Sequence, residues 1–368
     1  MDFIAKDKDF RPIAVIDLYS SAIWTERYSE LGDFQLDVPL SAAYLDALAD
    51  GNYLTLKDTD TVMIVESMNI ESDISTGKKT ATYKGRELAS ILTRRIVWSQ
   101  KIITGNIEQV IRTLLNENAI SPPQGQSART IPNFTFPAIS DEALRTYLRS
   151  INIEVQFVGD TLYDAIKSIC DRFGLGFKIV FNNASPAVMN FVLYRGVDRS
   201  AEQTERDAII FSPEYDTLIN SRYLSDTTEY KNTAMILGEE EEGQPRSKTS
   251  VWTWETEPTG LDRRELFVDA NDLRSQQDDG TVMEPSEYVA SLQHRGFEKL
   301  DEKSISTVFD GQVETSIGPQ YGVDYFLGDR VSTINEFGIG AVAQITEYIR
   351  GYDEGGYKEY PTFVMDNG

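Results

Sequence analysis

The sequence predicts a mainly β fold with α+β insertions, and two observations carry this prediction. Short runs of β-branched and aromatic residues, separated by turn residues, fill residues 1 to about 100 and return after residue 304. Between these parts, apolar residues at helical spacing alternate with further strand-like runs. At 368 residues, with 17 Phe and 18 Tyr, the chain has the length and the apolar material for two or three packed domains.

The first hundred residues favour an antiparallel sandwich or barrel. The strand-like runs are residues 13–16, 34–38, 53–56 and 62–65, and turn residues separate them at 32–33, 50–52 and 75–77. One short helix is expected after Ser41, carrying Tyr44, Leu45 and Leu48, and another from Arg86 through Leu92. Short strands with so few helices are typical of all-β architectures.

The next segment, residues 101–208, has the pattern of a small α+β unit. Gly105-Asn106 precedes apolar residues at the spacing of one helical face: Ile107, Val110, Ile111, Leu114 and Leu115. A polar, proline-rich loop follows between residues 121 and 140. A second amphipathic helix runs from Leu162 to Phe173 and stops at Gly174, and strands are expected at 177–181 and 189–194.

Strand character returns at 209–211 and 232–238, and the acidic run 239–243 marks a boundary as a solvated loop. Residues 239–303 form an insertion with strands at 251–254 and 265–268 and a helix that Pro285 begins. That helix is expected to pack through Tyr288, Val289, Leu292 and Leu300, which leaves His294 on the surface. From residue 304 the chain is β again to its end.

The last strands include the most informative local pattern. Leu327-Gly328-Asp329 is a turn that delivers the chain into a strand, because Gly tolerates positive φ and Asp bonds its own backbone. The turn, strand, connection and strand of residues 328–348 echo those of residues 51–68. Any strand-rich chain produces such pairs by chance, so chance similarity is one reading. A true repeat would imply two copies of one barrel.

Composition excludes several classes of function. The net charge is −24, with 59 acidic against 35 basic residues, which removes the basic surface that holds a phosphate backbone. A single cysteine, Cys170 on the apolar face of a predicted helix, excludes an internal disulfide, and a single histidine, His294, removes most hydrolytic and histidine-based metal sites. The N-terminus lacks the blocks of a signal peptide, and no apolar run is long enough for a membrane span.

Each candidate active site has a simpler structural explanation. Gly174-Leu175-Gly176 lies at a helix C-terminus, where the dipole disfavours phosphate, so it is read as a C-cap. The segments 269–272 and 278–280 lack the full ligand run of a calcium loop, and Ser29, Glu30 and Ser304 lack a histidine partner. The sequence therefore predicts no catalytic residue, no cofactor-binding residue, no metal ligand and no cofactor. We expect the chain not to be an enzyme.

Three sets of segments, taken in order along the chain, carry a family resemblance. They are RYSELGDFQLDVP (27–39) with YKGRELASIL (83–92), then NTAMILG (232–238) with RELFVDANDL (264–273), and lastly residues 324–348 with YPTF (360–363). In these the chain resembles the tail-hub proteins of long-tailed phages, in particular the siphovirus tail family typified by the ReqiPepy-type phages. The likeness spans nearly the whole chain.

The resemblance implies a trimeric ring with pseudo-sixfold symmetry, in which each chain holds two tube-type antiparallel β-barrels plus two smaller domains. The first barrel would be residues 1–100, and the second would be residues 209–238 joined to 304–368. The small α+β domain would be residues 101–208 and the inserted domain 239–303. Two barrels per chain would match a threefold ring to a sixfold tail tube.

The same resemblance implies a structural role in the virion, at the distal end of the tail, after assembly in the host cytoplasm. The expected partners are two further copies of the chain, the distal tail protein or tail tube ring, the tape-measure protein, and tail-fibre, spike or receptor-binding components. Double-stranded DNA would pass through only in transit, and we expect an excess of acidic residues on strands that face the channel. Since the chain ends soon after the last barrel, any wall-cleaving activity is expected in another protein.

Two other readings remain open. One is a carboxylate-based peptidoglycan hydrolase at the tail tip, which two acidic residues alone could support. The other is a carbohydrate-binding module that uses Trp252 and Trp254, which would alternate on one strand face, although core packing or a subunit contact explains them as well. Incubation with peptidoglycan separates these readings, since a hydrolase releases soluble fragments and a binding module sediments with the wall.

Overall fold

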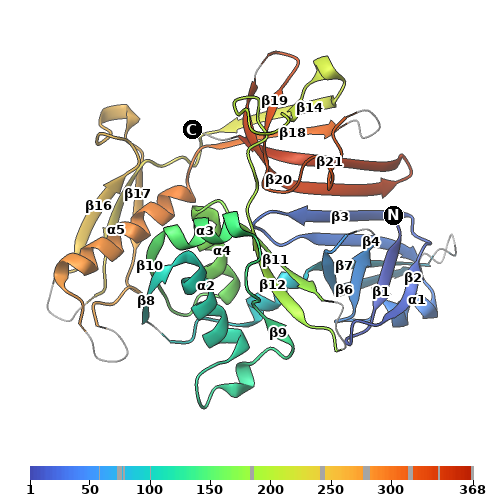
Figure 1. Ribbon diagram of the computed structural model, residues 1–368, viewed down its shortest axis with the longest axis horizontal. Coiled ribbons are helices and arrows are strands. Elements are labelled where there is room, and N and C mark those ends of the chain that lie inside the picture. The colour runs from blue at the N-terminus through green and yellow to red at the C-terminus, as the bar shows by residue number, and fades with distance from the viewer. Residues whose placement is uncertain are drawn as a thin grey trace.

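The computed structural model describes residues 1–57, 59–72, 77, 79–99, 101–182, 186–240, 245–276, 282–313, 318–338 and 340–365. Strands account for 40% of the chain and helices for 22%, which confirms the mainly β prediction. In Figure 1 the N-terminal strands and the C-terminal strands lie next to each other, with the helical middle segment beside them. The predicted turn at 75–76, the second half of the acidic run and the segment 278–280 lie outside the described residues.

One antiparallel sheet, with a single short parallel pair at its side, holds most of the strands. Across the sheet the order is β14 (Leu218–Asp226), β18 (Ser306–Val313), β21 (Gly356–Met365), β20 (Gly340–Asp353), β3 (Ser21–Arg27), β4 (Asp33–Pro39), β7 (Lys79–Glu87), β6 (Val62–Ser72), β5 (Tyr53–Leu56), β1 (Phe3–Lys6) and β2 (Pro12–Ile16). Beside this path, β19 (Arg330–Ile334) pairs with β20, and β13 (Ile210–Phe211) pairs in parallel with β19.

Two five-stranded motifs with the same topology make up most of this sheet, and β1, β2 and β13 lie outside them. The first motif has the order β3-β4-β7-β6-β5 and the second has the order β14-β18-β21-β20-β19. When the five strands of each motif are numbered along the chain, their order across the sheet is first, second, fifth, fourth and third. All of these neighbours are antiparallel. The internal echo in the sequence is therefore a structural repeat and not a chance similarity.

The repeat extends to single hydrogen bonds. The amide of Gly51 donates to the carbonyl of Val65 at 2.9 Å, and the amide of Gly328 donates to the carbonyl of Ile345 at 2.8 Å. Both glycines have positive φ, +77° and +88°, which a side chain would disfavour. The register of β6 with β7 shifts after Val65, and that of β20 with β21 shifts after Ile345, so each motif has a bulge at the equivalent place.

Each motif has its own hydrophobic core. The first is built on Trp24, Leu36 and Tyr83, and the second on Phe211, Ile345 and Phe363, among other buried residues. Among the described strands, no hydrogen bonding closes either motif into a barrel. Instead, β3 of the first motif pairs with β20 of the second, so the two predicted barrels are observed as two motifs of one open sheet.

The middle segment folds as the predicted α+β unit. Its elements are β8 (Lys101–Asn106), α2 (Ile107–Leu115), β9 (Phe134–Thr135), α3 (Glu142–Ser150), β10 (Asn152–Phe157), α4 (Leu162–Arg172), β11 (Gly176–Phe181) and β12 (Met189–Tyr194). Asn106 caps α2 in a capping box with Gln109, and Gly174, at φ +59°, ends α4 as predicted. The sequence pattern did not predict β8, α3 or β10.

A third, smaller sheet packs on one helix. It has the order β16 (Lys248–Trp252), β15 (Thr233–Leu237) and β17 (Glu265–Asp269), and α5 (Pro285–Asp301) covers it. The prediction placed residues 232–238 with the second barrel, but β15 pairs with β16 and β17. Within α5, Tyr288, Leu292 and Leu300 are buried as predicted, whereas Val289 is 37% exposed.

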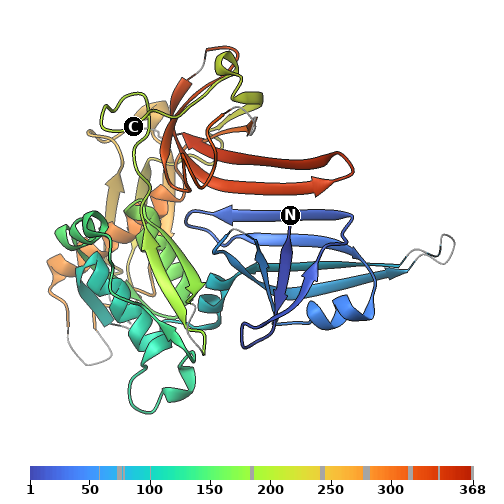
Figure 2. The ribbon, with the colours of Figure 1, turned by 45° about the vertical axis from the view of Figure 1, so that its right-hand side comes forward.

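Short elements complete the chain. They are α1 (Ala42–Ala47), which Ser41 caps as predicted, 3₁₀ helices at Leu88–Arg94, Ser127–Arg129, Pro213–Tyr215 and Gly260–Asp262, and a π turn at Asn116–Ile120. Among the described residues, no helix is both long and apolar enough to cross a membrane. Figure 2 shows β3, β4, β20 and β21 lying side by side, while the hairpin of β6 and β7 projects from the body.

Candidate functional site

The pairing of β3 with β20, which we call the seam, joins the two motifs. It runs from Glu347 opposite Arg27 to Tyr352 opposite Ala22. The residues that it joins lie about three hundred positions apart in sequence, for example 320 positions between Arg27 and Glu347. The seam therefore makes one continuous sheet from the two ends of the chain, as Figures 1 and 2 show.

A buried ion pair lies under the seam on the core side. Arg350 donates to Glu26 at 2.8 Å, and the two side chains are only 13% and 10% exposed. Trp24 Nε1 and the hydroxyl of Tyr321 also donate to the Glu26 carboxylate, at 3.1 and 3.2 Å. The Arg350 guanidinium lies 4.8 Å from the ring centre of Tyr348. Because the carboxylate accepts three hydrogen bonds, its burial is compensated.

On the opposite side of the seam, Arg27 binds both motifs. Its guanidinium donates to Glu347 of β20, to Asp33 of β4 and to the backbone carbonyl of Leu31. Planar guanidinium donors suit several acceptors at once. The seam thus has an arginine anchored to carboxylates on each of its faces.

Tyr28, which follows β3, ties the middle segment to both motifs. Its hydroxyl donates to the carbonyl of Gly174 at 2.8 Å and accepts from the amide of Gly196 at 3.1 Å. Its ring lies against Gly328, where an added Cβ would fall 2.1 Å from a ring carbon. Burial raises the pKa of Tyr28 to about 12. Three segments distant in sequence therefore meet at one side chain.

Two strands of the repeated motifs have an unpaired edge, whereas β2, which ends the sheet, lies outside the motifs. β5 pairs with β6 only from Val62 to Ile64, and beyond the bulge at Val65 this edge of β6 has no strand partner in the described residues. Among the described strands, β14 pairs only with β18. Apolar side chains are exposed on both strands: Met68 at 50%, Ile70 at 45%, Tyr223 at 42% and Leu224 at 40%. Unpaired edges with exposed apolar residues are sites for strand addition.

A carboxyl group is buried next to the seam. The carboxylate of Glu87, which is 4% exposed, accepts a hydrogen bond from the amide of Gly32 at 3.3 Å. The pKa of Glu87 is raised to about 8, chiefly by burial, with a smaller contribution from the nearby carboxylate of Glu26 and against the lowering effect of the Gly32 amide. Glu87 is therefore protonated at neutral pH in the folded chain.

The Glu87→Gln variant is expected to change the pH dependence of stability. In the unfolded chain the carboxyl titrates near 4.3, whereas in the folded chain its pKa is about 8, so wild-type stability falls as pH rises between these values. Since Gln carries no ionisable proton, the stability of the variant relative to wild type should improve by about 1.4 kcal/mol per pH unit between pH 5 and 8. Urea denaturation at three pH values measures this. A constant difference between the two proteins would contradict the assignment.

The structure provides no support for the catalytic alternatives. Cys170 is buried, and burial raises the pKa of its thiol well above the usual range, so it is not a nucleophile. His294 is exposed, as predicted. Among the described residues, no three His, Cys, Asp or Glu side chains form a group that could hold a metal ion.

The acidic and tryptophan candidates also have structural roles. Asp269 pairs with Arg246, and Asp272 pairs with Arg295 at 3.0 Å, so neither is part of a calcium loop. β16 ends at Trp252, and Trp254, 44% exposed, lies beyond it and donates to the Tyr230 hydroxyl at 3.2 Å. The two tryptophans therefore do not share a strand face. Ser29 and Glu30 lie between β3 and β4, and Ser304 follows α5, where it lines the same cleft as His294. Among the described residues, no side-chain hydrogen bond joins any of these three residues to His294.

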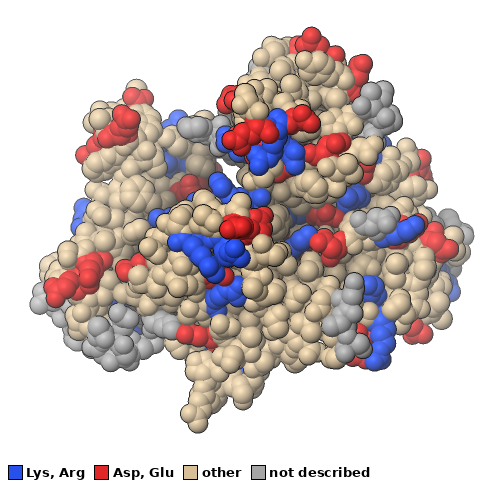
Figure 3. All heavy atoms as spheres, viewed as in Figure 1, with Lys and Arg blue, Asp and Glu red and all other residues tan. Residues whose placement is uncertain are grey.

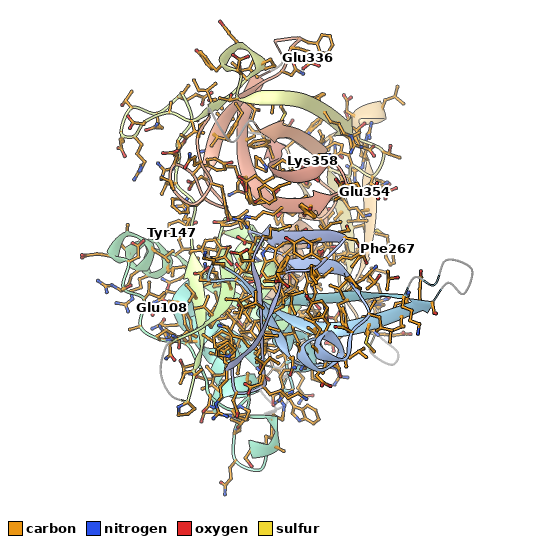
Figure 4. All side chains as sticks on the ribbon, turned by 90° about the vertical axis from the view of Figure 1, so that its right-hand side faces the viewer. Glu108, Tyr147, Phe267, Glu336, Glu354 and Lys358 are labelled. Atoms are coloured by element: carbon orange, nitrogen blue, oxygen red, sulfur yellow. The ribbon has the colours of Figure 1, made fainter. Side chains whose placement is uncertain are left out.

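A cleft that the sequence analysis did not find lies between α4 and α5. Its volume is about 1390 Å³, and charged side chains from both helices line it together with Phe297. Figure 3 shows the surface hollowed between the lobe of β15 to β17 and its neighbours, with acidic and basic side chains interspersed. In Figure 4, Glu108, which binds Arg112 and Arg149, lies within the middle segment, whereas Glu354 and Lys358 lie on the hairpin of β20 and β21.

Comparisons with solved structures agree on the fold. A tail protein from Neisseria meningitidis MC58 has a TM-score of 0.58 at 13% identity, with 100% of this chain and 97% of that chain covered. The 43 kDa tail protein of prophage MuSo2 from Shewanella oneidensis has a TM-score of 0.55 at 12% identity, with 99% and 98% covered. Prophage tail protein gp18 from Listeria monocytogenes EGD-e has a TM-score of 0.53 at 13% identity, with 100% and 95% covered.

No curated protein sequence matches this chain. The sequence pattern of the Siphovirus ReqiPepy6 Gp37-like proteins, however, matches residues 4–363, nearly the whole length. This confirms the resemblance that the sequence segments carried. The chain therefore belongs to the Siphovirus ReqiPepy6 Gp37-like protein family and is a phage tail protein.

Proposed function

We propose that this tail protein is a hub at the distal end of the tail of a long-tailed phage, or of a phage-derived particle, and that three copies form a ring around the DNA channel. The observation that carries the proposal is the sheet with two repeated motifs, in which β14 and β6 each keep an unpaired edge. Eight strands, from β14 to β6, run between those edges, and neighbours alternate in direction. The two edges are therefore antiparallel to each other, as head-to-tail ring closure requires.

The size of the sheet favours three copies. Neighbouring strands lie about 4.8 Å apart, so eight strands span roughly 38 Å of circumference and three copies span roughly 115 Å. Such a ring is about 37 Å across at the backbone, and inward side chains would leave a bore of roughly 25 Å, wide enough for a DNA duplex. A ring of two copies would leave roughly half that width. Three copies of two motifs also give the pseudo-sixfold arrangement.

The face of this sheet opposite the cores would line the channel. Strand alternation and the ion pair of Arg86 with Glu66 put seven acidic and five basic described side chains there: Asp33, Asp37, Glu66, Glu71, Asp226, Glu347 and Asp353, against Arg27, Lys84, Arg86, Arg222 and Lys358. This modest acidic excess agrees with the expected lining. Like charge would keep the DNA backbone from binding during transit.

In this proposal the ring joins the tail tube or distal tail ring to the tail tip, and touches the tape-measure protein and receptor-binding components. The role is structural and not enzymatic. Buried or ion-paired carboxylates, such as Glu26 and Glu108, support this view because they serve packing. Release of soluble fragments from purified peptidoglycan by the protein would contradict it.

The mass of the particle in solution tests the proposal. We expect an assembly of three chains of 41.5 kDa each, about 125 kDa in total, with an axial hole in negative-stain images. Mass photometry over a range of concentrations measures this directly. A monomer that persists at the highest concentrations would refute the ring, and so would a compact closed dimer.

A further inference from the structure

We infer that the unpaired edge of β6, from Ser67 to Ser72, pairs with β14 of a second copy of this chain in a defined register. This inference rests on the proposed ring and deepens it by naming the strands and residues of the contact. The partner is a second copy because the chain already contains this contact once, as the seam between its own two motifs.

The two motifs define equivalent positions. At the seam, the fourth strand of the second motif, β20, pairs with the first strand of the first motif, β3. The equivalent fourth strand of the first motif is β6, and the equivalent first strand of the second motif is β14. Within the two motifs, these are the strands whose outer edges are unpaired in the described residues. Repeating the seam between copies therefore joins β6 to the β14 of a neighbour.

The strand registers within each motif fix which residues correspond. The shared bulge aligns Ile345 with Val65, so that Gly351 corresponds to Glu71 and Tyr348 to Met68. The strand pairings can be followed from β6 to β3 in the first motif and from β20 to β14 in the second. They make Ile23 correspond to Arg222 and Glu26 correspond to Ser225. At the seam, Gly351 lies opposite Ile23, and Tyr348 lies opposite Glu26. In the contact between copies, Glu71 would therefore lie opposite Arg222 of the next copy. Met68 would lie opposite Ser225 of that copy.

The side chains at this register are complementary. Glu71 and Arg222 carry opposite charge, and both are exposed within the single chain. Ile70, 45% exposed, would lie opposite Tyr223, 42% exposed, on the core side. Aromatic and β-branched residues and opposite charges are favourable cross-strand pairs.

Side chains at the seam are buried, whereas the equivalent side chains at the unpaired edges of β6 and β14 are exposed. Trp24 on β3 is fully buried, whereas its equivalent on β14, Tyr223, is 42% exposed. Tyr348 on β20 is 1% exposed, whereas its equivalent on β6, Met68, is 50% exposed. The same positions are covered where the motifs meet within one chain and uncovered at the outer edges. A second copy placed by the repeat would cover them.

Paired cysteines in the full chain test the register. Glu71→Cys with Arg222→Cys, and Met68→Cys with Ser225→Cys, place thiols directly opposite each other across the contact, about 5 Å apart between Cβ atoms. The exchanged combinations, Glu71→Cys with Ser225→Cys and Met68→Cys with Arg222→Cys, shift the thiols by three residues, roughly 10 Å along the strand. All four positions are exposed, so the four variants are matched controls for one another. The native Cys170 is buried.

After mild oxidation, denaturing gels are expected to show disulfide-linked dimers and trimers, and no larger species, for the two directly opposed variants only. Mass photometry of the same unoxidised samples reports ring formation independently. A ring that cross-links in the exchanged combinations, or in none, would overturn this register while the proposed hub stands. A monomer would overturn both.

Discussion

Replacing Arg350 by methionine is expected to destabilise the folded chain by about 3–5 kcal/mol, because the change leaves the buried carboxylate of Glu26 without its cation. Because the two side chains are only 13% and 10% exposed, solvent screens this ion pair much less than it screens a surface ion pair. Methionine retains the apolar contact with the ring of Tyr348 while it removes the charge. Urea denaturation followed by tryptophan fluorescence measures the loss, since Trp24 lies at the seam.

The double variant with Glu26→Gln and Arg350→Met controls for the ion pair itself. Removing both charges takes away the uncompensated carboxylate, so the double variant should be more stable than Arg350→Met alone. Equal stability of the two variants would show that lost packing, and not the stranded charge, causes the effect. Arg263→Met, at an exposed pair with Glu257 and Glu265, should leave the denaturation midpoint unchanged.

The second large effect is expected at Gly328. Replacement by alanine places a Cβ 2.1 Å from the ring of Tyr28, at a backbone φ of +88° that alanine disfavours. Strain at positive φ costs about 1–2 kcal/mol, and forcing Tyr28 from its site adds about 1–3 kcal/mol. The total, roughly 2–5 kcal/mol, is measured by chemical denaturation. Tyr28 contacts the middle segment too, so amide exchange should also increase near Gly174 and Gly196.

The repeat supplies a matched control for this variant. Gly51 holds the equivalent turn of the first motif, with φ +77°, but an alanine Cβ there would meet only the flexible end of Lys8, at 3.3 Å. The Gly51→Ala variant should therefore lose only the backbone contribution, about 1–2 kcal/mol. If both variants lost the same stability, the contact with Tyr28 would be of no consequence.

Local elements could be predicted from the sequence because their signals are local. Gly105-Asn106 and the apolar face from Ile107 predicted α2, and Gly174 marked the end of α4. In contrast, α3 was missed because only Leu144 and Leu148 are buried on it, too few residues to establish a helical period. The repeat was visible in residues 51–68 and 328–348 because turn glycines and bulged strands keep the same order.

Strand partners could not be predicted, since pairing depends on distant segments. The strand pattern at β15 was correct, but nothing within it specifies β16 and β17 as neighbours. The buried pair of Glu26 and Arg350 is likewise invisible in sequence, because the two residues lie 324 positions apart. The pKa of Glu87 is raised by packing around it, which residue type alone does not report.

The distance in sequence between the strands of the seam constrains synthesis on the ribosome. β3 is among the first strands to emerge, yet its outer neighbour β20 is translated more than three hundred residues later. At a translation rate of roughly 5–20 residues per second, the nascent N-terminal motif waits on the order of tens of seconds with that edge uncovered. During this interval the edge is open to mispairing with other nascent chains. Host chaperones that bind unpaired strands should therefore have their largest influence on the yield of this protein before translation ends.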